Sequence, residues 1–531
     1  MAGKISTNRR KRRKFNANSK RRNTLNLHKP SGVIGPRVRR VGGEKFAIVC
    51  VDPAKHRSEW MMVDYFGNLL IERQTLEHQA AFFKLAVMQI REAQQQHDIQ
   101  DMIVVVERTG NYHLAFKRAF AKAGFETRVV HPFATKQYRM PADPGNKTDG
   151  TDLNAQHRAA VAGFGLCELE LESPYRELQL RARHRRNLVE KAAAMACQIR
   201  EQLHLAMPGF STLFDHLLDN KSAMAIARRC ASPAVALELG QAGLSQHLRE
   251  TMVRSQPRTI DKVLAWASQA ASSDTIQDGT LHHAIWTDLE ELYQHFQQRI
   301  RVLERELAGD LVQTPHIRLL AISGINAVSA AELAGEMGPI TRYANANAIT
   351  GRCGLYPSRH QSDQTDNDCG PIIRQANRRI RCALMRIADN LVCHCAYYRG
   401  LADVDRARGI NERAIRVKIA KKFSRLAFAC VAGDEPLKHP AMQQPDSIME
   451  KLRKFHQVHQ TPMDQVLADL KTTVGQLPYH TRNREAEIVA DVLRRHATRR
   501  RGCVGIGALL PAILARLEIK ATEDNENRDR S

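Results

Sequence analysis

Residues 46 to 52 read "FAIVCVD", a short apolar run with several β-branched residues that ends on an aspartate. A run of this length and composition predicts a buried β-strand. The segment "WMMVDYFGNLLIERQT", residues 60 to 75, predicts two further strands that turn at Gly67 and Asn68. We therefore expect the folded part of the chain to begin with a meander of three strands.

Helices and strands alternate after this meander. The hydrophobic pattern predicts a helix over 78–96, the strand "MIVVVE" over 102–107, a helix over 112–123, the strand "TRVVHP" over 127–132 and a helix from about 148. Three strands followed by alternating helices and strands is, by analogy, the order of a ribonuclease H-like α/β sheet. We expect this domain to span residues 45–170.

Four carboxylates stand out in this predicted domain. Asp52 ends the first strand, Glu107 ends the fourth, and neighbouring strand ends converge at one edge of a sheet. Asp149 and Asp152, in "NKTDGTDLNAQ" at residues 146 to 156, are three positions apart and share one helical face. Converging carboxylates repel one another unless a cation neutralises them, and oxygen ligands favour Mg²⁺ or Mn²⁺ over zinc. Turn, ion-pair and helix-start roles are the ordinary alternatives for each acid alone.

The charge of the chain predicts a polyanionic partner. Lys and Arg number 80 against 56 acidic residues, and much of this excess lies in "NRRKRRKFNANSKRR", residues 8 to 22. Residues 1–44 lack apolar periodicity and are expected to form a disordered basic arm. The sequence has no apolar run of about eighteen residues, and its 11 scattered cysteines do not suggest a disulfide framework. We therefore expect a cytoplasmic protein that does not enter membranes.

The middle of the chain predicts a helical arm over residues 171–312. Residues 173–204 and 289–311 are rich in Leu, Ala and charged residues with few helix breakers, which favours two long helices able to pair as a coiled coil. The arginines of "RARHRRNL", residues 181 to 188, are expected either to bind phosphates or to remain solvated.

A third, all-α domain is predicted over residues 313–435. The segment "LLAISGINAVSAAELAGEMG", residues 319 to 338, has the spacing of a helix-hairpin-helix with Gly324 in the turn, and such a hairpin can seat a phosphate at a helix N-terminus. A polar loop then leads to a helix with Arg378 and Arg381 in its first turns. With Arg374 just before this helix, they are candidate phosphate contacts, and a solvated helix face is the alternative. Residues 436–531 are expected to form a basic helical extension.

Two sets of motifs resemble a known family. The blocks "VDPAK" (51–55), "VERTGNYH" (106–113) and "HPFATKQYRMPADPGNKTDGTDLNAQ" (131–156) are similar to those of the bacterial insertion-sequence 110 family of transposases. The hairpin segment and "GRCGLYPSRHQSDQTDNDCGPIIRQANRRIRCALM" (351–385) resemble the second domain of that family. The likeness covers about residues 45–400, although the hairpin reads Ser-Gly-Ile-Asn where the family usually has Pro-Gly-Ile-Gly.

The resemblance implies both fold and mechanism. Its N-terminal domain would be a Holliday-resolvase-like ribonuclease H fold whose DEDD tetrad is Asp52, Glu107, Asp149 and Asp152. The serine of the second domain, here Ser362, would attack a DNA phosphodiester and become covalently linked, with Mg²⁺ or Mn²⁺ bound at the tetrad. The implied function is a DNA transposase or recombinase that moves an insertion sequence.

The resemblance also implies partners. Family members use a structured RNA encoded by the element to pair with donor and target DNA. They assemble as homodimers or homotetramers in which the DEDD domain of one subunit meets the serine domain of another. The expected location is the bacterial cytoplasm, at the nucleoid.

Two other functions compete with this interpretation. A metal-dependent Holliday-junction nuclease needs the four carboxylates but no serine and forms no covalent intermediate. A non-enzymatic RNA-binding protein is supported by the charge alone, and the carboxylates argue against it. The motif around Ser362 favours the recombinase over the nuclease.

Overall fold

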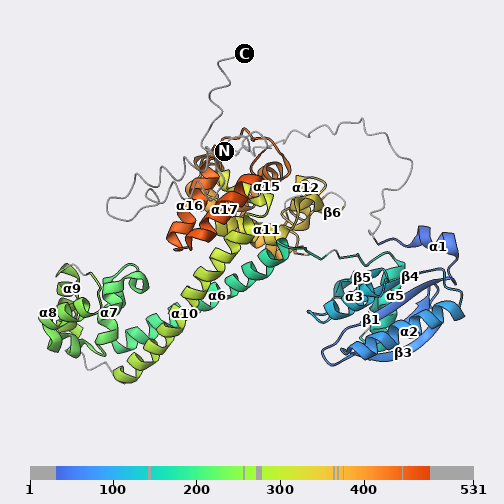
Figure 1. The fold of residues 1–531 in the computed structure, drawn as a ribbon, viewed down its shortest axis with the longest axis horizontal. Coiled ribbons are helices and arrows are strands. Elements are labelled where there is room, and N and C mark those ends of the chain that lie inside the picture. Colours follow the sequence, from blue (N-terminus) through green and yellow to red (C-terminus); the bar gives the residue numbers. More distant parts are fainter. Residues whose placement is uncertain are drawn as a thin grey trace, which may run out of the picture. The chain divides into compact units, whose positions relative to one another are not determined.

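The computed structural model describes residues 32–141, 145–168, 170–254, 257–270, 278–362, 365–367, 370–374, 376–444 and 446–478. These residues form two compact units, one ending at Glu170 and the other starting at Leu171 (Figure 1). Residues 1–31 of the predicted arm and 479–531 of the predicted extension lie outside the described residues.

The first unit is a mixed α/β domain built on one five-stranded sheet. Its elements are α1 (Gly35–Val41), β1 (Phe46–Asp52), β2 (Arg57–Asp64), β3 (Leu69–Glu77), α2 (Ala80–Gln96), β4 (Asp101–Glu107), α3 (His113–Lys122), β5 (Thr127–Val130), α4 (Pro132–Arg139) and α5 (Asp149–Val161). The strand order is β3-β2-β1-β4-β5, with β1 antiparallel to β2 and parallel to β4. The predicted meander and the following alternation of helices and strands are confirmed.

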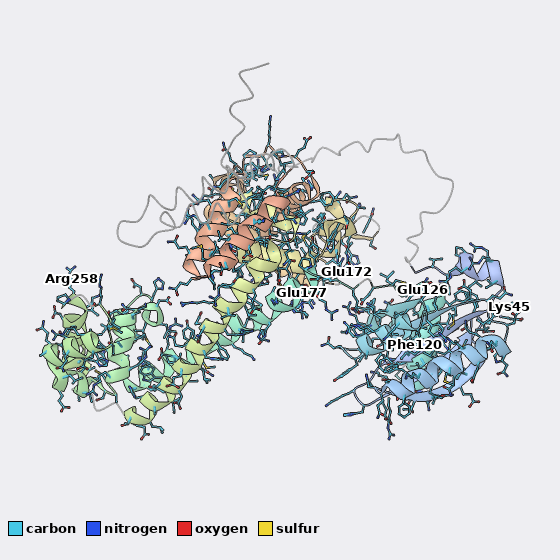
Figure 2. The ribbon with its side chains drawn as sticks, viewed as in Figure 1. Lys45, Phe120, Glu126, Glu172, Glu177 and Arg258 are labelled. Carbon is cyan, nitrogen blue, oxygen red and sulfur yellow. The ribbon has the colours of Figure 1, made fainter. Side chains whose placement is uncertain are left out.

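The central strand β1 is covered on both faces. Ala47, Val49 and Val51 pack toward α2 and α3, whose Phe120, labelled in Figure 2, is fully buried. Ile48 and Cys50 face the other way and pack with residues of α5. A strand buried on both faces needs apolar residues at consecutive positions, and this is why the sequence shows an uninterrupted apolar run.

The folded domain begins earlier than predicted. The arm was expected to extend to residue 44, but Ile34 is fully buried in the core beneath α5, and α1 follows it directly. Arg37 of α1 forms ion pairs with Asp101 and, at 2.6 Å, with Glu126. A basic sequence without apolar periodicity still forms structure here, because a buried isoleucine, two partly buried valines of α1 and paired charges attach it to the sheet.

Two long helices dominate the start of the second unit. α6 (Tyr175–Ala206) and α10 (Gly279–Leu311) run side by side in Figure 1. Leu188 and Ala192 of α6 form a buried cluster with Ile300 and Leu303 of α10. The two helices are antiparallel, because the ion pairs between them join later residues of α6 to earlier residues of α10. The two predicted long helices are confirmed, and α10 begins ten residues before the predicted start. Their classification as a coiled coil remains a prediction.

Three arginines of the cluster on α6 pair with carboxylates of other helices, and the fourth, Arg186, forms an exposed pair within α6. The sequence had suggested phosphate binding or solvation, and it did not reveal these ion pairs between helices. The pairs are Arg181–Asp310, Arg183–Glu336 at 2.7 Å, Arg185–Glu304 at 2.7 Å and Arg186–Glu190 at 2.9 Å.

A small helical subdomain joins the far ends of α6 and α10 (Figure 1). Its own core contains Phe210 and Trp286, both fully buried, together with Ile199 and Leu203 from the last turns of α6. The elements are η1 (Phe210–Leu213), η2 (Leu217–Asp219), α7 (Lys221–Arg229), α8 (Pro233–Glu250) and α9 (Pro257–Ala270).

The helices among the remaining elements share one large core, whereas the residues of strand β6 (His360–Ser362) are exposed. The remaining elements are η3 (Pro315–Ala321), α11 (Ala327–Met337), η4 (Ile340–Arg342), α12 (Ala346–Arg352), β6, β7 (Thr365–Asn367), α13 (Arg378–His394), α14 (Ala396–Ala407), α15 (Glu412–Ala432), α16 (Asp446–Val458) and α17 (Met463–Gln476). Leu178 of α6, Leu311 of α10 and Leu452 of α16 all belong to this core. The predicted boundaries at residues 312/313 and 435/436 therefore cut through a single packed body.

The predicted helix-hairpin-helix contains one short 3₁₀ helix, η3, and one α-helix, α11. Gly324 between them has φ of +87°, and a Cβ there would lie 3.1 Å from the carbonyl oxygen of Asn390 on α13. Both constraints require glycine at this turn. Because the first member is not an α-helix, the helix-hairpin-helix assignment remains a prediction. Among the helices of the described segments, we find none with the length and apolar character of a membrane span.

Candidate active site

The sheet brings Asp52 and Glu107 to the same edge. β1 and β4 are parallel, with Val51 opposite Val106, and each strand ends one residue later on its carboxylate. Side chains alternate along a strand, so Asp52 shares a face with Cys50, and Glu107 shares that face with Val105. This is the face that α5 covers. Both acids therefore lie at the carboxyl ends of adjacent parallel strands, where open α/β sheets bind ligands.

The helix α5 supplies the other two acids from its first turn. Thr148 caps the helix, with its hydroxyl accepting a hydrogen bond from the Thr151 amide at 3.2 Å, while the Thr148 amide donates to the Thr151 hydroxyl at 2.9 Å. Asp152 is buried and Asp149 is exposed. Leu153, fully buried against the sheet, fixes the rotation of the helix. The positive end of the helix dipole favours both carboxylates there.

The charges of the four acids act on one another. Burial raises the pKa of Asp52 to about 7, and the charges of Glu107, Asp152 and Asp149 add to this shift while Lys147 opposes it. Burial also raises the pKa of Glu107, and the charge of Asp152 raises it further. The folded domain thus brings together all four carboxylates that the sequence singled out.

Cations from the segment around α4 and α5 offset part of this negative charge. Arg139 of α4 donates a hydrogen bond to Asp152, and its charge also lowers the pKa of Glu107. The exposed Lys147 lies near enough to act on both Asp52 and Glu107.

The residues present fit a divalent cation. One oxygen of Glu107, Oε2, is buried and has no hydrogen-bond partner, and burial, with the neighbouring negative charges, raises the pKa of Asp52. Within the described ranges, no three His, Cys, Asp or Glu side chains are grouped closely enough to hold a metal as they stand. Carboxylate rotamers, and the guanidinium of Arg139 on Asp152, would therefore have to adjust when a cation binds.

Sequence reasoning missed several residues around these acids. Glu59 of β2 lies directly opposite Asp52. Its carboxylate accepts a hydrogen bond from the hydroxyl of Thr75 at 3.0 Å, and its Oε2 lies 3.8 Å from Nε of Arg73. Arg139 was missed although it stands in the block that contains Asp149 and Asp152. A signal was present, because basic residues surround those acids, but the sequence does not show which cation meets which acid.

Ser362 lies at the end of a β-hairpin, where the sequence suggested a polar loop. It is exposed and is the last residue of β6, paired with Thr365 of β7. The two arms of the hairpin continue to pair below it, where the Ser358 amide donates to the carbonyl of Pro371 at 2.9 Å. Antiparallel pairing satisfies the backbone of this polar segment and leaves the hydroxyl of Ser362 at the surface. Asp363, next in sequence, lies outside the described residues.

The candidate phosphate contacts divide into two groups. Arg374 and Arg378 are exposed. Arg381 is partly buried and donates hydrogen bonds to the carbonyls of Cys353, at 2.7 Å, and Ile373, which flank the serine hairpin. Arg381 thus holds the base of the hairpin against α13 through contacts that the sequence pattern does not reveal.

The N-terminus of α11 after Gly324 is already capped. The Asn326 side chain accepts a hydrogen bond from the Ser329 amide at 2.8 Å, and the Asn326 amide donates to the Ser329 hydroxyl at 3.2 Å. Asn326 is one of the departures from the family hairpin, and it stabilises the start of the helix. The Ser329 amide is therefore not free for a phosphate in this structure.

The raised pKa of Asp52 predicts a pH-dependent stability. A carboxylate whose pKa is higher in the folded state destabilises that state once it ionises, so stability should fall as pH rises from about 4 through 7. In chelator, Asp52→Asn is therefore expected to raise the free energy of unfolding by about 2–4 kcal/mol at pH 8. The gain should disappear near pH 4. Denaturant titrations at several pH values measure this difference.

Asp101→Asn is the matched control in the same domain. The hydrogen bond from Arg37 lowers the pKa of Asp101, so its ionised form stabilises the fold above about pH 4, and this contribution is lost as pH falls. Asp101→Asn should therefore destabilise the protein at pH 8. Equal effects of the two substitutions would contradict the electrostatic description of the site.

Comparisons with known families match both units of the chain. A family model described as Transposase, for the DEDD domain of IS110 elements, covers residues 49–208 and includes all four clustered acids. A second, described as Transposase IS116/IS110/IS902 family, covers residues 317–402 and includes Ser362. No curated protein matches the chain. Both matches are to one family and follow each other along the chain, the first extending from the first unit into α6 and the second lying within the second unit, so the chain belongs to the IS110 family of transposases and is a DNA transposase.

Proposed function

We propose that this transposase cleaves and rejoins DNA strands with a divalent metal at Asp52, Glu107, Asp149 and Asp152 and with Ser362 as the nucleophile. The observation that carries the proposal is the approach of two carboxylates on α5 to the two at the ends of β1 and β4, where burial and the neighbouring negative charges raise the pKa of Asp52 to about 7. A divalent cation would relieve this repulsion more effectively than the single positive charges of Lys147 and Arg139 do.

The tetrad residues have distinct tasks in this proposal. Asp52 and Glu107 hold fixed positions because they end rigid strands, and Asp149 and Asp152 approach them from the capped end of α5. Mg²⁺ or Mn²⁺, when bound there, would neutralise charge on the phosphate that reacts. Glu107 Oε2, buried and unpartnered, could become a ligand without first giving up another partner.

Ser362 supplies the covalent step. Its hydroxyl oxygen forms a bond to phosphorus and releases its proton, while the bond from phosphorus to a sugar oxygen breaks and that oxygen leaves protonated. A sugar hydroxyl of the strand to be joined then attacks the same phosphorus and restores the serine. Exposure of Ser362 at the end of its hairpin supports this role. Arg374 and Arg378, exposed near the start of α13, are proposed phosphate contacts.

The proposed partners are donor DNA, target DNA and a structured guide RNA, with the protein acting as a homodimer or homotetramer. The formal net charge of +24 supports binding of nucleic acid by its backbone. Sequence choice would then depend on base pairing with the RNA, and protein side chains would contribute mainly affinity.

A cleavage assay on DNA of the element ends, with RNA transcribed from the non-coding segment beside the gene, tests this function. With Mg²⁺ we expect strand cleavage and a protein–DNA adduct that survives denaturation. With excess chelator we expect neither product. Cleavage that persists in chelator would refute the metal proposal, and metal-dependent cleavage without an adduct would favour the junction nuclease.

The basic segment before residue 32 is expected to contribute affinity more than catalysis. Deleting residues 1–31 leaves Ile34 and α1 in place, and should weaken nucleic-acid binding and flatten the dependence of log K on log salt. The slope should change by about 0.9 for each phosphate that the protein no longer binds. A full-length variant with Lys and Arg of this segment replaced by Gln is the control for length. An unchanged slope in both variants would show that the segment binds no phosphates.

A further inference from the structure

We propose that Arg139 is a placeholder cation, whose guanidinium holds Asp152 until a divalent metal displaces it. This inference rests on the proposed metal function and extends it to a residue outside the tetrad. It concerns how the site is kept folded and charge-balanced before metal and DNA arrive.

The first argument is position. Arg139, in the last turn of α4, donates from Nη1 to Oδ1 of Asp152. The side chains are only 13% and 9% exposed, so the pair is largely shielded from water. The charge of Arg139 also reaches Glu107, which shows that the guanidinium lies within range of two members of the tetrad. A cation that binds one tetrad acid and acts on the charge of a second would compete with a metal for the same carboxylates.

The second argument is chemical competition. An arginine cannot release its charge by deprotonation, and a metal can take Oδ1 of Asp152 only if the guanidinium gives it up. The described residues show no preformed group of three metal-binding side chains, as expected if Asp152 is held by the arginine. Glu107 Oε2 remains without a partner, so Arg139 satisfies only part of the site.

The third argument is that a buried carboxylate requires a partner. Asp152 is 6% exposed as a residue, and a carboxylate at that depth without a cation is strongly destabilising. Folding of the metal-free domain therefore benefits from Arg139, and metal binding must overcome the same ion pair. Arg139 is thus a positioning residue that lowers metal affinity and stabilises the metal-free fold.

The test compares Mn²⁺ binding to the full chain without nucleic acid, measured by calorimetry or electron paramagnetic resonance. Arg139→Gln should bind Mn²⁺ about tenfold more tightly or better, because a competing charge is removed. Its melting temperature should be lower than that of the wild type in chelator and should rise more on addition of saturating Mn²⁺. Arg139→Lys keeps the charge and should remain close to the wild type in affinity.

Two further variants complete the design. Lys147→Gln removes an exposed cation near the same acids, leaves folding intact and should raise Mn²⁺ affinity by a smaller factor. Arg118→Gln removes an arginine paired with Glu170 at 2.9 Å on the surface of the same domain and should change nothing.

The outcomes separate the two proposals. If wild-type binding of Mn²⁺ is absent or insensitive to Asp52→Asn, the proposed metal function is wrong. If that binding is present but Arg139→Gln and Lys147→Gln leave it unchanged or weaken it, the placeholder role is wrong. In that case Arg139 orients Asp152 for the metal or serves only to pack α4 against α5.

Discussion

Asp52→Asn is expected to lower DNA strand cleavage by about a thousandfold or more in a protein that is no less stable than the wild type above pH 7. The amide keeps the shape of the side chain at the end of β1 but loses the charge that holds a divalent metal, and several kcal/mol of transition-state stabilisation are lost with it. The raised pKa of Asp52 shows that its ionised form costs folding free energy in chelator. Asp52→Asn should therefore lower the rate of strand cleavage and raise the free energy of unfolding in chelator.

The other tetrad acids should behave alike in activity. Glu107→Gln, Asp149→Asn and Asp152→Asn are each expected to lose cleavage, whereas binding of DNA should persist. Glu59→Gln is the matched control, because Glu59 lies opposite Asp52 on β2 but is not part of the tetrad. Comparing single-turnover cleavage of these variants at saturating Mg²⁺ measures the effect. If Glu59→Gln lost as much cleavage as Asp52→Asn, the total negative charge near the end of β1 would matter more than membership of the tetrad.

Ser362→Ala is expected to eliminate the covalent protein–DNA adduct. The substitution removes one oxygen from an exposed side chain, so folding and binding of Mn²⁺, RNA and DNA should be unchanged. A denaturing gel with labelled DNA shows the adduct as a band of reduced mobility. We expect none above background in the variant, and strand joining should fall with it by about a thousandfold or more.

Ser358→Ala is the control from the same hairpin. Ser358 belongs to the paired base, where its amide and carbonyl bond to the opposite arm, and its hydroxyl is not proposed to react. This variant should form adduct at the wild-type level. An adduct that persists in Ser362→Ala would identify another nucleophile or an artefact of the gel, and adduct-free cleavage by the wild type would support a metal-dependent nuclease.

The fold of the first unit was predictable because its signals are local. Successive side chains of residues 46 to 52 point to opposite faces of the sheet, and both faces are buried. The strands β1 and β4 end at Asp52 and Glu107, as the sequence predicted. Local patterns failed where long-range contacts decide the structure. Arg37 lies in a basic segment without periodicity, yet α1 folds because its apolar residues pack on the sheet and because Asp101 and Glu126, far along the chain, pair with that arginine.

The second unit shows the same limit. Helix α16 lies beyond the predicted domain boundary at residue 435, but Leu452 packs into the core that contains Leu178 and Leu311. Hydrophobic periodicity identifies the apolar face of a helix, but it does not show which other helix packs against that face. The arginines of α6 likewise lie on a correctly predicted helix, but the sequence did not reveal their ion pairs, because the carboxylate partners lie on α10 and α11 in three of the four pairs.

Residue types and spacing alone specify a strand that ends on Asp52, another that ends on Glu107 and two acids on one face of a helix. These features follow from the repeat of side-chain direction every 2 residues in a strand and every 3.6 residues in a helix. They also specify the family, through motifs that hold their order along the chain. Tertiary structure decides the rest: the parallel register that sets Val51 opposite Val106, the guanidinium of Arg139 on Asp152 and the exposure of Ser362 on a hairpin anchored by Arg381. Each of these features depends on contacts between residues that are far apart in the sequence. The burial that such contacts create sets the ionisation of the carboxylates in the site.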